Sequence, residues 1–436
     1  MSETPFDVCV VGLGYVGLTL ATAFADKGLV VAGTERVPEV VETLRKGELS
    51  FYERGLSEVL AAVVHQQRLQ IFSVDEPLPR ARAYIITVGT PLRDGAITFA
   101  DLDHALQTVA DGMPDGALVI LRSTVRIGIT EQTARPILAA SGKSFLLAMA
   151  PERTIEGRAL QELSSLPQIV GGIDEASTEA AAALFERLGV EIVRLTDPKA
   201  AEFAKLVSNT WRDLQFAFAN ELAYMADAAG VNVYDVIDAA SYHYDRLTLA
   251  KPGPVAGPCL EKDAYILGDS ASYFGTEVPL SLTGRAVNEH IVSHVRDIAG
   301  SLVTDAHKIA ILGLAFKGRP GTSDTRGSLA GNYAHEFQDA WPGAAIYGWD
   351  PLVSPEDSAA MGITFADVQD AVKDADLILI QTNHPEFSSE QFVELVAATA
   401  REGAVVVDLW NQTDALARTR PDMTVAVLGR VGEVQA

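Results

Sequence analysis

The sequence has little cysteine and no long apolar run. Only Cys9 and Cys259 occur among 436 residues, which excludes a disulfide framework and fits a reducing cytosol. No stretch of about 18 uninterrupted apolar residues is present, so no membrane span is expected. The N-terminus has no basic region ahead of its first apolar run, which argues against a signal peptide. We therefore expect a cytoplasmic protein.

Basic residues are also scarce. The chain has 34 Lys and Arg against 58 Asp and Glu, which gives a formal net charge of −24 at pH 7. Such a charge disfavours nucleic acid and anionic membrane surfaces as partners. Helix N-termini and a few cations can still hold phosphate groups locally, so the charge does not exclude a nucleotide ligand. No metal site is predicted.

The first half of the chain alternates short apolar runs with amphipathic segments. The length suggests two or three domains at roughly 150 residues each, and the 48% hydrophobic content supports sizeable cores. We predict helices over 16–27 and 37–46, and strands in FDVCVVG, LVVAGTE, AYIITVG, ALVILRST and FLLAMAP. This pattern predicts a parallel sheet with helices on both faces, in which Cys9 is a small core residue.

Between Asp197 and Leu302 the pattern changes to long helices. The segment AAEFAKLVSNTWRDLQFAFANELAYMADAAG has no interior Gly or Pro and ends in a possible capping glycine. It is apolar on more than one face, which predicts burial in a core or a subunit interface.

After His307 the strand–helix alternation restarts. KIAILGLAFKG, AAIYGWD, DLILIQT, AVVVDLW and MTVAVLG read as strands of a second parallel sheet. We predict an α/β protein of two Rossmann-like parallel-sheet domains, residues 1–196 and 303–436, joined by a helical region over 197–302.

A glycine motif follows the first strand and opens a helix. Gly12, Gly14 and Gly17 allow a tight turn, close approach of the backbone to a pyrophosphate, and close packing of helix on strand. Glu35 ends the next strand, 18 residues past Gly17, where an acid can accept both ribose hydroxyls. That acid repels a 2′-phosphate, so the motif favours NAD over NADP, although the cation Arg36 lies beside it. The alternative is a glycine turn without a cofactor.

Lys205 and Asn209 are four residues apart on the predicted long helix and share one face. By helical angle they lie opposite Phe203, Val207 and Leu214, which we expect to pack inward elsewhere. A Lys and an Asn directed into a cleft suit stabilisation of an oxyanion or alkoxide. A solvated helix face is the alternative.

Cys259 lies in PGPVAGPCLEKDAYIL, a Gly- and Pro-rich loop that leads into a helix. A thiol at a helix start near a cation such as Lys262 has a lowered pKa and is more nucleophilic. Asp263 faces the same side one turn later and can act as a base for water. The alternative is a cysteine without a chemical role.

These segments together resemble the UDP-glucose/GDP-mannose dehydrogenase family, the nucleotide-sugar 6-dehydrogenases. The matching motifs follow one another along nearly the whole chain: GLGYVG, VGTPLRDG, RSTV, APERTIEGR, AAEFAKLVSNT, NELA, PGPVAGPCLEKD, LGLAFKGRPGTSDTRGS, HPEF and VVVDLWN. The resemblance implies an N-terminal NAD domain, a long central helix that forms a homodimer or higher homo-oligomer, and a C-terminal domain that holds a UDP-sugar.

The resemblance also implies a four-electron oxidation of the sugar's carbon-6 hydroxyl. Cys259 takes the place of the family's nucleophile, which traps the aldehyde as a thiohemiacetal and is then acylated as a thioester that water hydrolyses. Lys205 and Asn209 correspond to the residues that stabilise the oxyanion. The remaining catalytic candidates, which order water or relay protons, are Thr124, Glu152, Glu156 and Asp263.

Further candidates contact the cofactor or the substrate. Besides the three glycines and Glu35, the cofactor candidates are Tyr15, Val16, Arg36, Thr90, Thr124, Lys262 and Arg326. The substrate candidates are Glu152, Arg153, Lys205, Asn209, Arg212, Arg246, Gly257, Lys317 and Arg326. Without the resemblance, Lys317 and Arg326 read as surface charges beside a loop.

Two segments are similar to the branch that acts on UDP-2-acetamido sugars. NTWRDLQFAFANELA contains Arg212 and Asp213, and SYHYDRLTLAKPG contains Arg246; both favour UDP-N-acetylmannosamine. The cysteine loop reads AGPC where that branch usually has GGHC, so UDP-N-acetylglucosamine and UDP-glucose stay as alternatives. Different classes are a single-step hydroxyacid dehydrogenase of the 6-phosphogluconate type and a non-catalytic nucleotide-binding protein.

Overall fold

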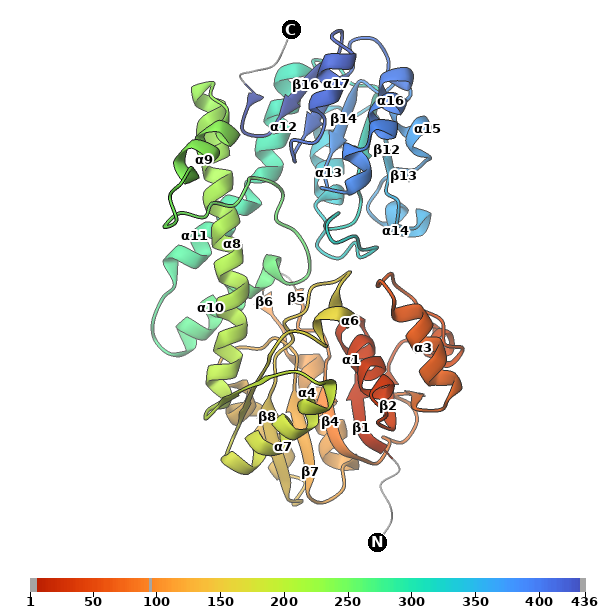
Figure 1. The fold of residues 1–436 in the computed structure, drawn as a ribbon, viewed down its shortest axis with the longest axis vertical. Coiled ribbons are helices and arrows are strands. Elements are labelled where there is room, and N and C mark those ends of the chain that lie inside the picture. The colour runs from red at the N-terminus through yellow and green to blue at the C-terminus, as the bar shows by residue number, and fades with distance from the viewer. Residues whose placement is uncertain (1–5, 94–95, 432–436) are drawn as a thin grey trace. The chain divides into compact units, whose positions relative to one another are not determined.

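A computed structural model describes residues 6–93 and 96–431, and the chain divides into two compact units. Unit 1 comprises Met1–Ser208 and Tyr265–Glu277, and unit 2 comprises Asn209–Ala264 and Val278–Ala436. Each unit contains one large sheet (Figure 1). No helix among the described residues is long and apolar enough to cross a membrane.

The sheet of unit 1 has eight strands in the order β10-β9-β8-β7-β4-β1-β2-β3. Their bounds are β1 (Phe6–Val11), β2 (Val31–Glu35), β3 (Leu69–Ser73), β4 (Ala81–Ile86), β7 (Ala117–Leu121), β8 (Phe145–Met149), β9 (Gln168–Gly172) and β10 (Ile192–Leu195). The short strands β5 (Leu92–Arg93) and β6 (Ala96–Ile97) form a separate antiparallel pair.

The predicted parallel arrangement is confirmed except at one pair, where β8 and β9 run antiparallel. The connection between them contains only the four-residue helix α6 (Ala159–Glu162). Such a helix rises roughly 6 Å, whereas a parallel crossover usually contains a helix long enough to return the chain along the strand.

Helices cover both faces of this sheet, as predicted. Val8 and Val10 belong to one hydrophobic cluster and Cys9 and Val11 to another, because successive side chains of a strand point to opposite faces. The helices are α1 (Tyr15–Asp26), α2 (Pro38–Arg45), α3 (Leu56–His65), α4 (Ala100–Gly112), η1 (Thr130–Ala134), α5 (Arg135–Ala139), α7 (Glu175–Phe185) and η2 (Glu186–Leu188).

The segment between the two sheets is helical, as its sequence predicts. It contains α8 (Pro198–Ala229), α9 (Val233–Ser241), α10 (Leu260–Tyr273), α11 (Pro279–Glu289) and α12 (Ile291–Leu302). The boundary between the two units falls within α8. Gly230, with φ +68°, follows the end of α8 as the predicted cap residue.

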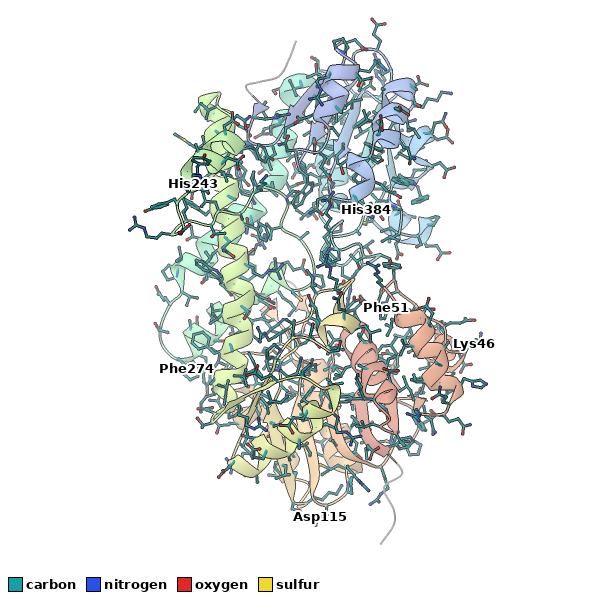
Figure 2. All side chains as sticks on the ribbon, in the orientation of Figure 1. Lys46, Phe51, Asp115, His243, Phe274 and His384 are labelled. Carbon is teal, nitrogen blue, oxygen red and sulfur yellow. The ribbon has the colours of Figure 1, made fainter. Side chains whose placement is uncertain are left out.

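One expectation about α8 is wrong. Phe203 and Val207 do not pack inward, since 47% and 49% of their surfaces are exposed. They belong to an apolar stripe that continues through Trp211, Phe218 and Met225, which are 60%, 51% and 68% exposed. Phe274, directly after α10, is also half exposed (Figure 2). Helical periodicity identifies an apolar face, but it does not say whether the chain's own core covers that face.

The sheet of unit 2 has six strands, all parallel, in the order β13-β12-β11-β14-β15-β16. They are β11 (Lys308–Leu312), β12 (Ala345–Trp349), β13 (Thr364–Phe365), β14 (Leu377–Ile380), β15 (Val405–Asp408) and β16 (Thr424–Val427). The surrounding helices are α13 (Ala330–Ala340), α14 (Pro355–Ala360), α15 (Val368–Val372), η3 (Pro385–Ser388), α16 (Glu390–Thr399) and α17 (Asp414–Thr419). Five strands match the predicted segments, and the two-residue β13 is too short to give a sequence signal.

Candidate active site

The glycine turn between β1 and α1 has the geometry of a dinucleotide site. Gly12 has φ +94°, a left-handed conformation that favours glycine. A Cβ on Gly17 would collide with the carbonyl oxygen of Gly12, so this glycine allows helix and strand to pack closely. Gly14 is exposed, and a Cβ there would meet nothing within 4 Å. The backbone at Gly14 is therefore open to a phosphate at the start of α1.

Glu35 braces this turn and keeps room for a ribose. Its Oε2 accepts the Leu13 N–H at 2.9 Å, and its Oε1 accepts the N–H groups of Arg36 and Val37 at 2.8 and 3.0 Å. A carboxylate has about four acceptor positions, so one is left for a ribose hydroxyl, where the sequence predicted two. The guanidinium of Arg36 lies 3.2 Å from Asp101 and is exposed. The turn and its acid thus fit NAD.

Unit 2 repeats this bracing at the end of β12. Oδ2 of Asp350 accepts the N–H groups of Leu314 and Ala315 at 2.8 and 3.1 Å. Its Oδ1 accepts the N–H groups of Leu352 and Val353 at 2.8 and 3.2 Å. All four acceptor positions of Asp350 are therefore taken by backbone, unlike those of Glu35.

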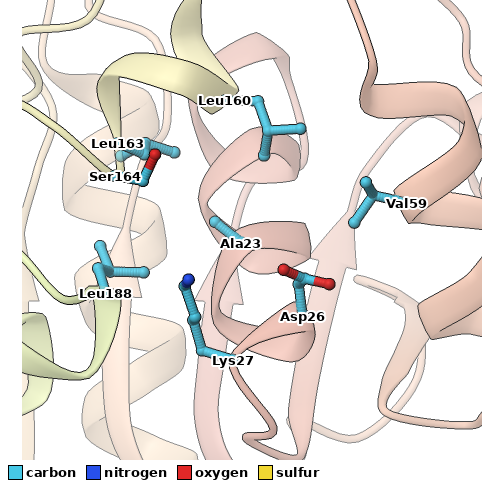
Figure 3. A pocket seen from close by; sticks show the side chains of 8 residues that line it. All are labelled: Ala23, Asp26, Lys27, Val59, Leu160, Leu163, Ser164 and Leu188. Carbon is cyan, nitrogen blue, oxygen red and sulfur yellow. The ribbon is translucent and has the colours of Figure 1, made fainter.

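A small cavity in unit 1, of about 140 Å³, is not the dinucleotide site. It is lined by Ala23, Asp26, Lys27, Val59, Leu160, Leu163, Ser164 and Leu188 (Figure 3). The α1 residues among them come from its last turns, whereas the glycine turn opens the helix at its other end.

Glu152, a catalytic and substrate candidate, is held in a buried ion pair. Oε2 accepts from Nε and Nη2 of Arg122 at 2.9 and 2.6 Å, and Oε1 accepts the N–H groups of Arg153 and Thr154 at 2.6 and 2.7 Å. Burial raises the pKa of this carboxyl, but the Arg122 charge and these hydrogen bonds outweigh burial and lower the pKa below its usual value. Glu152 is therefore an ionised acid whose two oxygens are engaged.

Arg122 was not singled out from the sequence. Only 1% of it is exposed, and it also donates to the Ala150 carbonyl and to Gln168. The available signal is an arginine directly after a strand of five apolar residues, a place where a buried charge needs a partner.

Other unit 1 candidates follow the ends of parallel strands, the edge at which α/β sheets bind ligands. Thr90 Oγ1 donates to the Thr124 carbonyl at 2.8 Å, and these residues follow β4 and β7. Tyr15 accepts the Gly157 N–H through its hydroxyl at 2.7 Å. Glu156 is half-buried.

The remaining unit 1 candidates, Val16 and Arg153, have more exposed side chains. Val16, in the first turn of α1, is half-buried, and the side chain of Arg153 is exposed. Asp94 and Gly95 of the VGTPLRDG motif lie outside the described residues.

Lys205 and Asn209 occupy successive turns of α8, and the solvated-face alternative is wrong for both. Lys205 is 7% and Asn209 8% exposed. Glu202, one turn earlier, is a buried acid that sequence reasoning missed. It accepts the N–H groups of Gly128 and Thr130 at 2.5 and 2.8 Å, and burial raises its pKa.

Cys259 is exposed and comes directly before α10. Its carbonyl accepts the N–H groups of Lys262 and Asp263 at 3.2 and 3.0 Å, so the thiol sits at the amino end of the helix. The side chain of Asp263, 1% exposed, accepts from Asn209 Nδ2 at 2.6 Å and from Lys262 Nζ at 3.2 Å. The predicted Asn209, Lys262 and Asp263 are thus brought together one turn from the cysteine.

Gly257 fixes the loop before the cysteine. Its φ is +100°, and a Cβ there would collide with the ring of Phe316. Its N–H donates to the Gly327 carbonyl at 3.0 Å. This contact joins the cysteine loop to the segment that contains the candidates Lys317 and Arg326.

Most of the cationic substrate candidates of unit 2 have exposed side chains. Lys317 Nζ lies 5.2 Å from the centre of the Phe316 ring, and exposed Arg326 forms an ion pair with Asp324. Arg212 on α8 and Arg246 after α9 are also exposed. These four side chains do not form one buried cluster with the residues around Cys259.

The fold and the glycine turn define an NAD-binding α/β protein with a second Rossmann-like unit. Family models match most of the chain: the NAD binding domain of the UDP-glucose/GDP-mannose dehydrogenase family over residues 6–189, its central domain over 199–290 and its UDP binding domain over 310–415. The chain belongs to this family, and it is an NAD-dependent nucleotide-sugar dehydrogenase. The predicted family, fold class and cofactor are confirmed.

Individual relatives carry different substrate names. The UDP-N-acetyl-D-mannosamine dehydrogenase of Pyrococcus horikoshii is 34% identical over 393 residues, which cover 88% of this chain and 90% of the relative. The solved structure of UDP-D-ManNAc dehydrogenase from that organism has a TM-score of 0.87 at 32% identity and covers 98% of this chain and 100% of that one. A UDP-glucose dehydrogenase from Pyrobaculum islandicum has a TM-score of 0.85 at 27% identity, over 97% and 98% of the chains. The fold therefore does not select the sugar.

Proposed function

We propose that this chain is a UDP-N-acetylmannosamine 6-dehydrogenase that oxidises the carbon-6 hydroxyl to a carboxylate. The name of the relative at 34% identity supports this substrate, as do the sequence features around Arg212 and Arg246. UDP-N-acetylglucosamine and UDP-glucose are the alternatives. The reaction converts one primary alcohol, one water and two NAD⁺ into a carboxylate, two NADH and three protons.

Cys259 is the proposed nucleophile, and its position carries the proposal. NAD, when bound, accepts the hydride in each of the two oxidations. The Cys259 thiolate adds to the aldehyde carbon formed first, and the resulting thiohemiacetal keeps that carbon on the enzyme. Its oxidation gives a thioester, which water hydrolyses to release the thiolate and the carboxylate. An exposed thiol at the amino end of α10 is available for this step.

Lys205 and Asn209 stabilise the negative oxygen that forms when the thiolate adds. The hydrogen bond from Asn209 to Asp263 orients the Asn209 amide, and Asp263 lies one helical turn after the cysteine. We assign water ordering to Asp263 and Thr124, and proton transfer to Asp263 and Glu156. Glu152 is not assigned to proton transfer, because both of its oxygens are already engaged. Its proposed role is to hold the strand ends together through Arg122.

The uridine diphosphate part of the substrate is assigned to unit 2. Lys317 and Arg326 supply positive charge for the diphosphate, and Gly257 keeps the cysteine loop against the segment that bears them. Arg153, Arg212 and Arg246 are the further proposed substrate contacts.

We also propose a cytoplasmic homodimer that forms through α8. The stripe of Phe203, Val207, Trp211, Phe218 and Met225 follows one side of the helix, with exposed fractions from 47% to 68%. Contiguous apolar surface of this kind is typical of a protein interface, and a second copy of the same stripe is a self-complementary partner.

The test is the amount of NADH formed per molecule of limiting sugar nucleotide. UDP-N-acetylmannosamine, UDP-N-acetylglucosamine, UDP-glucose and GDP-mannose are assayed in parallel, and two NADH from the first alone is the expected result. Cys259→Ser should abolish the second oxidation, whereas Cys9→Ala, a change in the core of unit 1, should keep the two-to-one ratio. One NADH per sugar in the unmodified protein, or two in Cys259→Ser, would contradict the thioester mechanism and favour a single-step dehydrogenase.

A further inference from the structure

Four polar side chains are buried between α8 and α11 in unit 2. Asp213 and Asn220 come from α8, Arg285 and Asn288 from α11, and none is more than 2% exposed. Asn220 Nδ2 donates to Asn288 Oδ1 at 2.9 Å, Asn288 Nδ2 donates to Asp213 Oδ1 at 2.8 Å, and Arg285 Nη1 donates to the same oxygen at 2.8 Å. We call these four residues the α8–α11 polar chain.

Joining two helices does not require such a chain. Replacing a buried ion pair by apolar residues of similar volume is often neutral or stabilising, and buried polar groups are unfavourable unless they are hydrogen-bonded. The hydrogen bonds that the chain makes outside the two helices therefore indicate its role.

Those outside bonds go to the loop before Cys259 and to the first residue of α10. Asn220 Oδ1 accepts the Gly253 N–H at 2.9 Å, and Asn220 Nδ2 donates to the Gly253 carbonyl at 3.1 Å. Arg285 Nη2 donates to the Val255 carbonyl at 3.4 Å, and Nη1 donates to the Leu260 carbonyl at 3.2 Å. The loop is thus held before the cysteine and directly after it.

At Gly253 and Val255, both among the described residues, no helix or strand hydrogen bonds hold the loop. Residues 251–256 have no regular secondary structure, and Gly253 has no side chain to pack. A Cβ on Gly253 would lie 2.6 Å from the Trp410 ring, so this ring and the Asn220 amide confine the backbone together. Movement of this segment would shift the start of α10 and with it the thiol.

We propose that the α8–α11 polar chain positions Cys259, with Arg285 and Asn220 as its positioning residues for the thiol. The inference rests on the proposed function, because positioning matters to the reaction only if Cys259 is the nucleophile. None of the four residues acts on the reacting atoms. The chain keeps the thiol at the amino end of α10, where the positive end of the helix dipole favours a thiolate.

Several charged groups share this region and are kept constant in the test. Lys262, Asp263 and the partly buried Glu261 lie on α10, and the charges of Asp324 and Arg326 act on Glu261. Glu289 on α11 approaches Arg285 Nε at 3.5 Å. The variants that are compared therefore leave these charged groups unchanged.

Alkylation by iodoacetamide reports on the Cys259 thiol alone. The second cysteine, Cys9, is 0% exposed, and burial raises its pKa to about 12. The rate of alkylation of the full chain is measured against pH without nucleotide, beside kcat and KM. In Arg285→Met we expect the midpoint of the pH profile to rise by about one unit or more. We expect kcat to fall by about a hundredfold, with a smaller change in KM. Arg285→Lys should fall between Arg285→Met and the unmodified protein.

Asn220→Leu and Tyr224→Phe separate positioning from general loss of stability. Asn220→Leu removes both bonds to Gly253 and leaves Arg285 intact, so it tests the proposal if Arg285→Met does not fold. Tyr224→Phe removes one hydrogen bond between α8 and α11, from the hydroxyl to the Val287 carbonyl at 3.1 Å, and does not touch the loop. It should lower the melting temperature without moving the alkylation midpoint.

The proposal is overturned if Asn220→Leu and folded Arg285 variants give the alkylation midpoint and kcat of Tyr224→Phe. A failure of the proposed function looks different, because Cys259→Ser would then still yield two NADH. The alkylation profile does not depend on turnover, so the two failures are distinguishable.

Discussion

The buried pair of Arg122 and Glu152 gives a quantitative test of how unit 1 is held together. Changing Glu152 to Gln removes the charge while keeping the size of the side chain. The guanidinium of Arg122, with no side-chain exposure, then loses its charged partner. Breaking a buried ion pair by removing one partner costs about 3–5 kcal/mol. In a domain of this size each kcal/mol shifts the melting temperature by about 2–4 °C, so we expect a drop of roughly 10 °C.

The assay is thermal unfolding of the full chain, followed through loss of NAD binding, which reports on unit 1. Arg194→Met is the matched control in the same unit. Its ion pairs with Glu179 and Glu186 are exposed, and such pairs contribute at most about 1 kcal/mol. The reasoning is refuted if Glu152→Gln is as stable as the unmodified protein. A stable but inactive Glu152→Gln would instead assign Glu152 to proton transfer.

The same pair predicts a pH dependence. The pKa of Glu152 is lowered in the folded state, so its stabilising contribution is fully present above the unfolded pKa, about 4.3, and is lost as the pH falls through the folded pKa. The melting temperatures of Glu152→Gln and the unmodified protein should therefore differ most near pH 7 and converge below about pH 4. A constant difference across this range would contradict the lowered pKa.

Two further changes test the cofactor turn and the exposed helix. Gly17→Ala places a methyl group against the Gly12 carbonyl, so we expect NAD affinity measured by calorimetry to fall by at least about tenfold; unchanged affinity would show that the turn adapts. Trp211→Glu places a charge in the α8 stripe and should convert a dimer to a monomer in sedimentation. The control Arg212→Glu changes an exposed residue and should leave the dimer intact. A dimer that persists in Trp211→Glu would show that α8 does not form the interface.

Most strands and the glycine turn could be predicted because their signals are local. Apart from Asp7, the residues over 6–11 are apolar on both faces, and Gly12, Gly14 and Gly17 follow at a fixed spacing. The sequence also placed Asn209 one turn from Lys205, and Asp263 one turn from Cys259, but it did not predict that Asn209, Lys262 and Asp263 meet. Their hydrogen bonds are a tertiary result that only the structure supplies.

The buried charge partners could not be predicted from sequence. Arg122 meets Glu152 across 30 residues, and Arg285 meets Asp213 across 72. No periodicity links such positions, because their pairing depends on which elements become neighbours in the fold. The error at Phe203 and Val207 has a related cause, since an apolar helix face looks the same whether the core or another molecule covers it.

Glu35 and Asp350 each hold a turn of the backbone in place before a nucleotide binds. Three backbone N–H groups bind Glu35, and four bind Asp350. The conformational entropy of these turns is lost when the chain folds, so an arriving nucleotide does not have to order them. Nucleotide affinity at both turns should therefore depend on contacts with the ligand more than on loop closure. The binding kinetics of the nucleotide should show no slow phase from loop ordering.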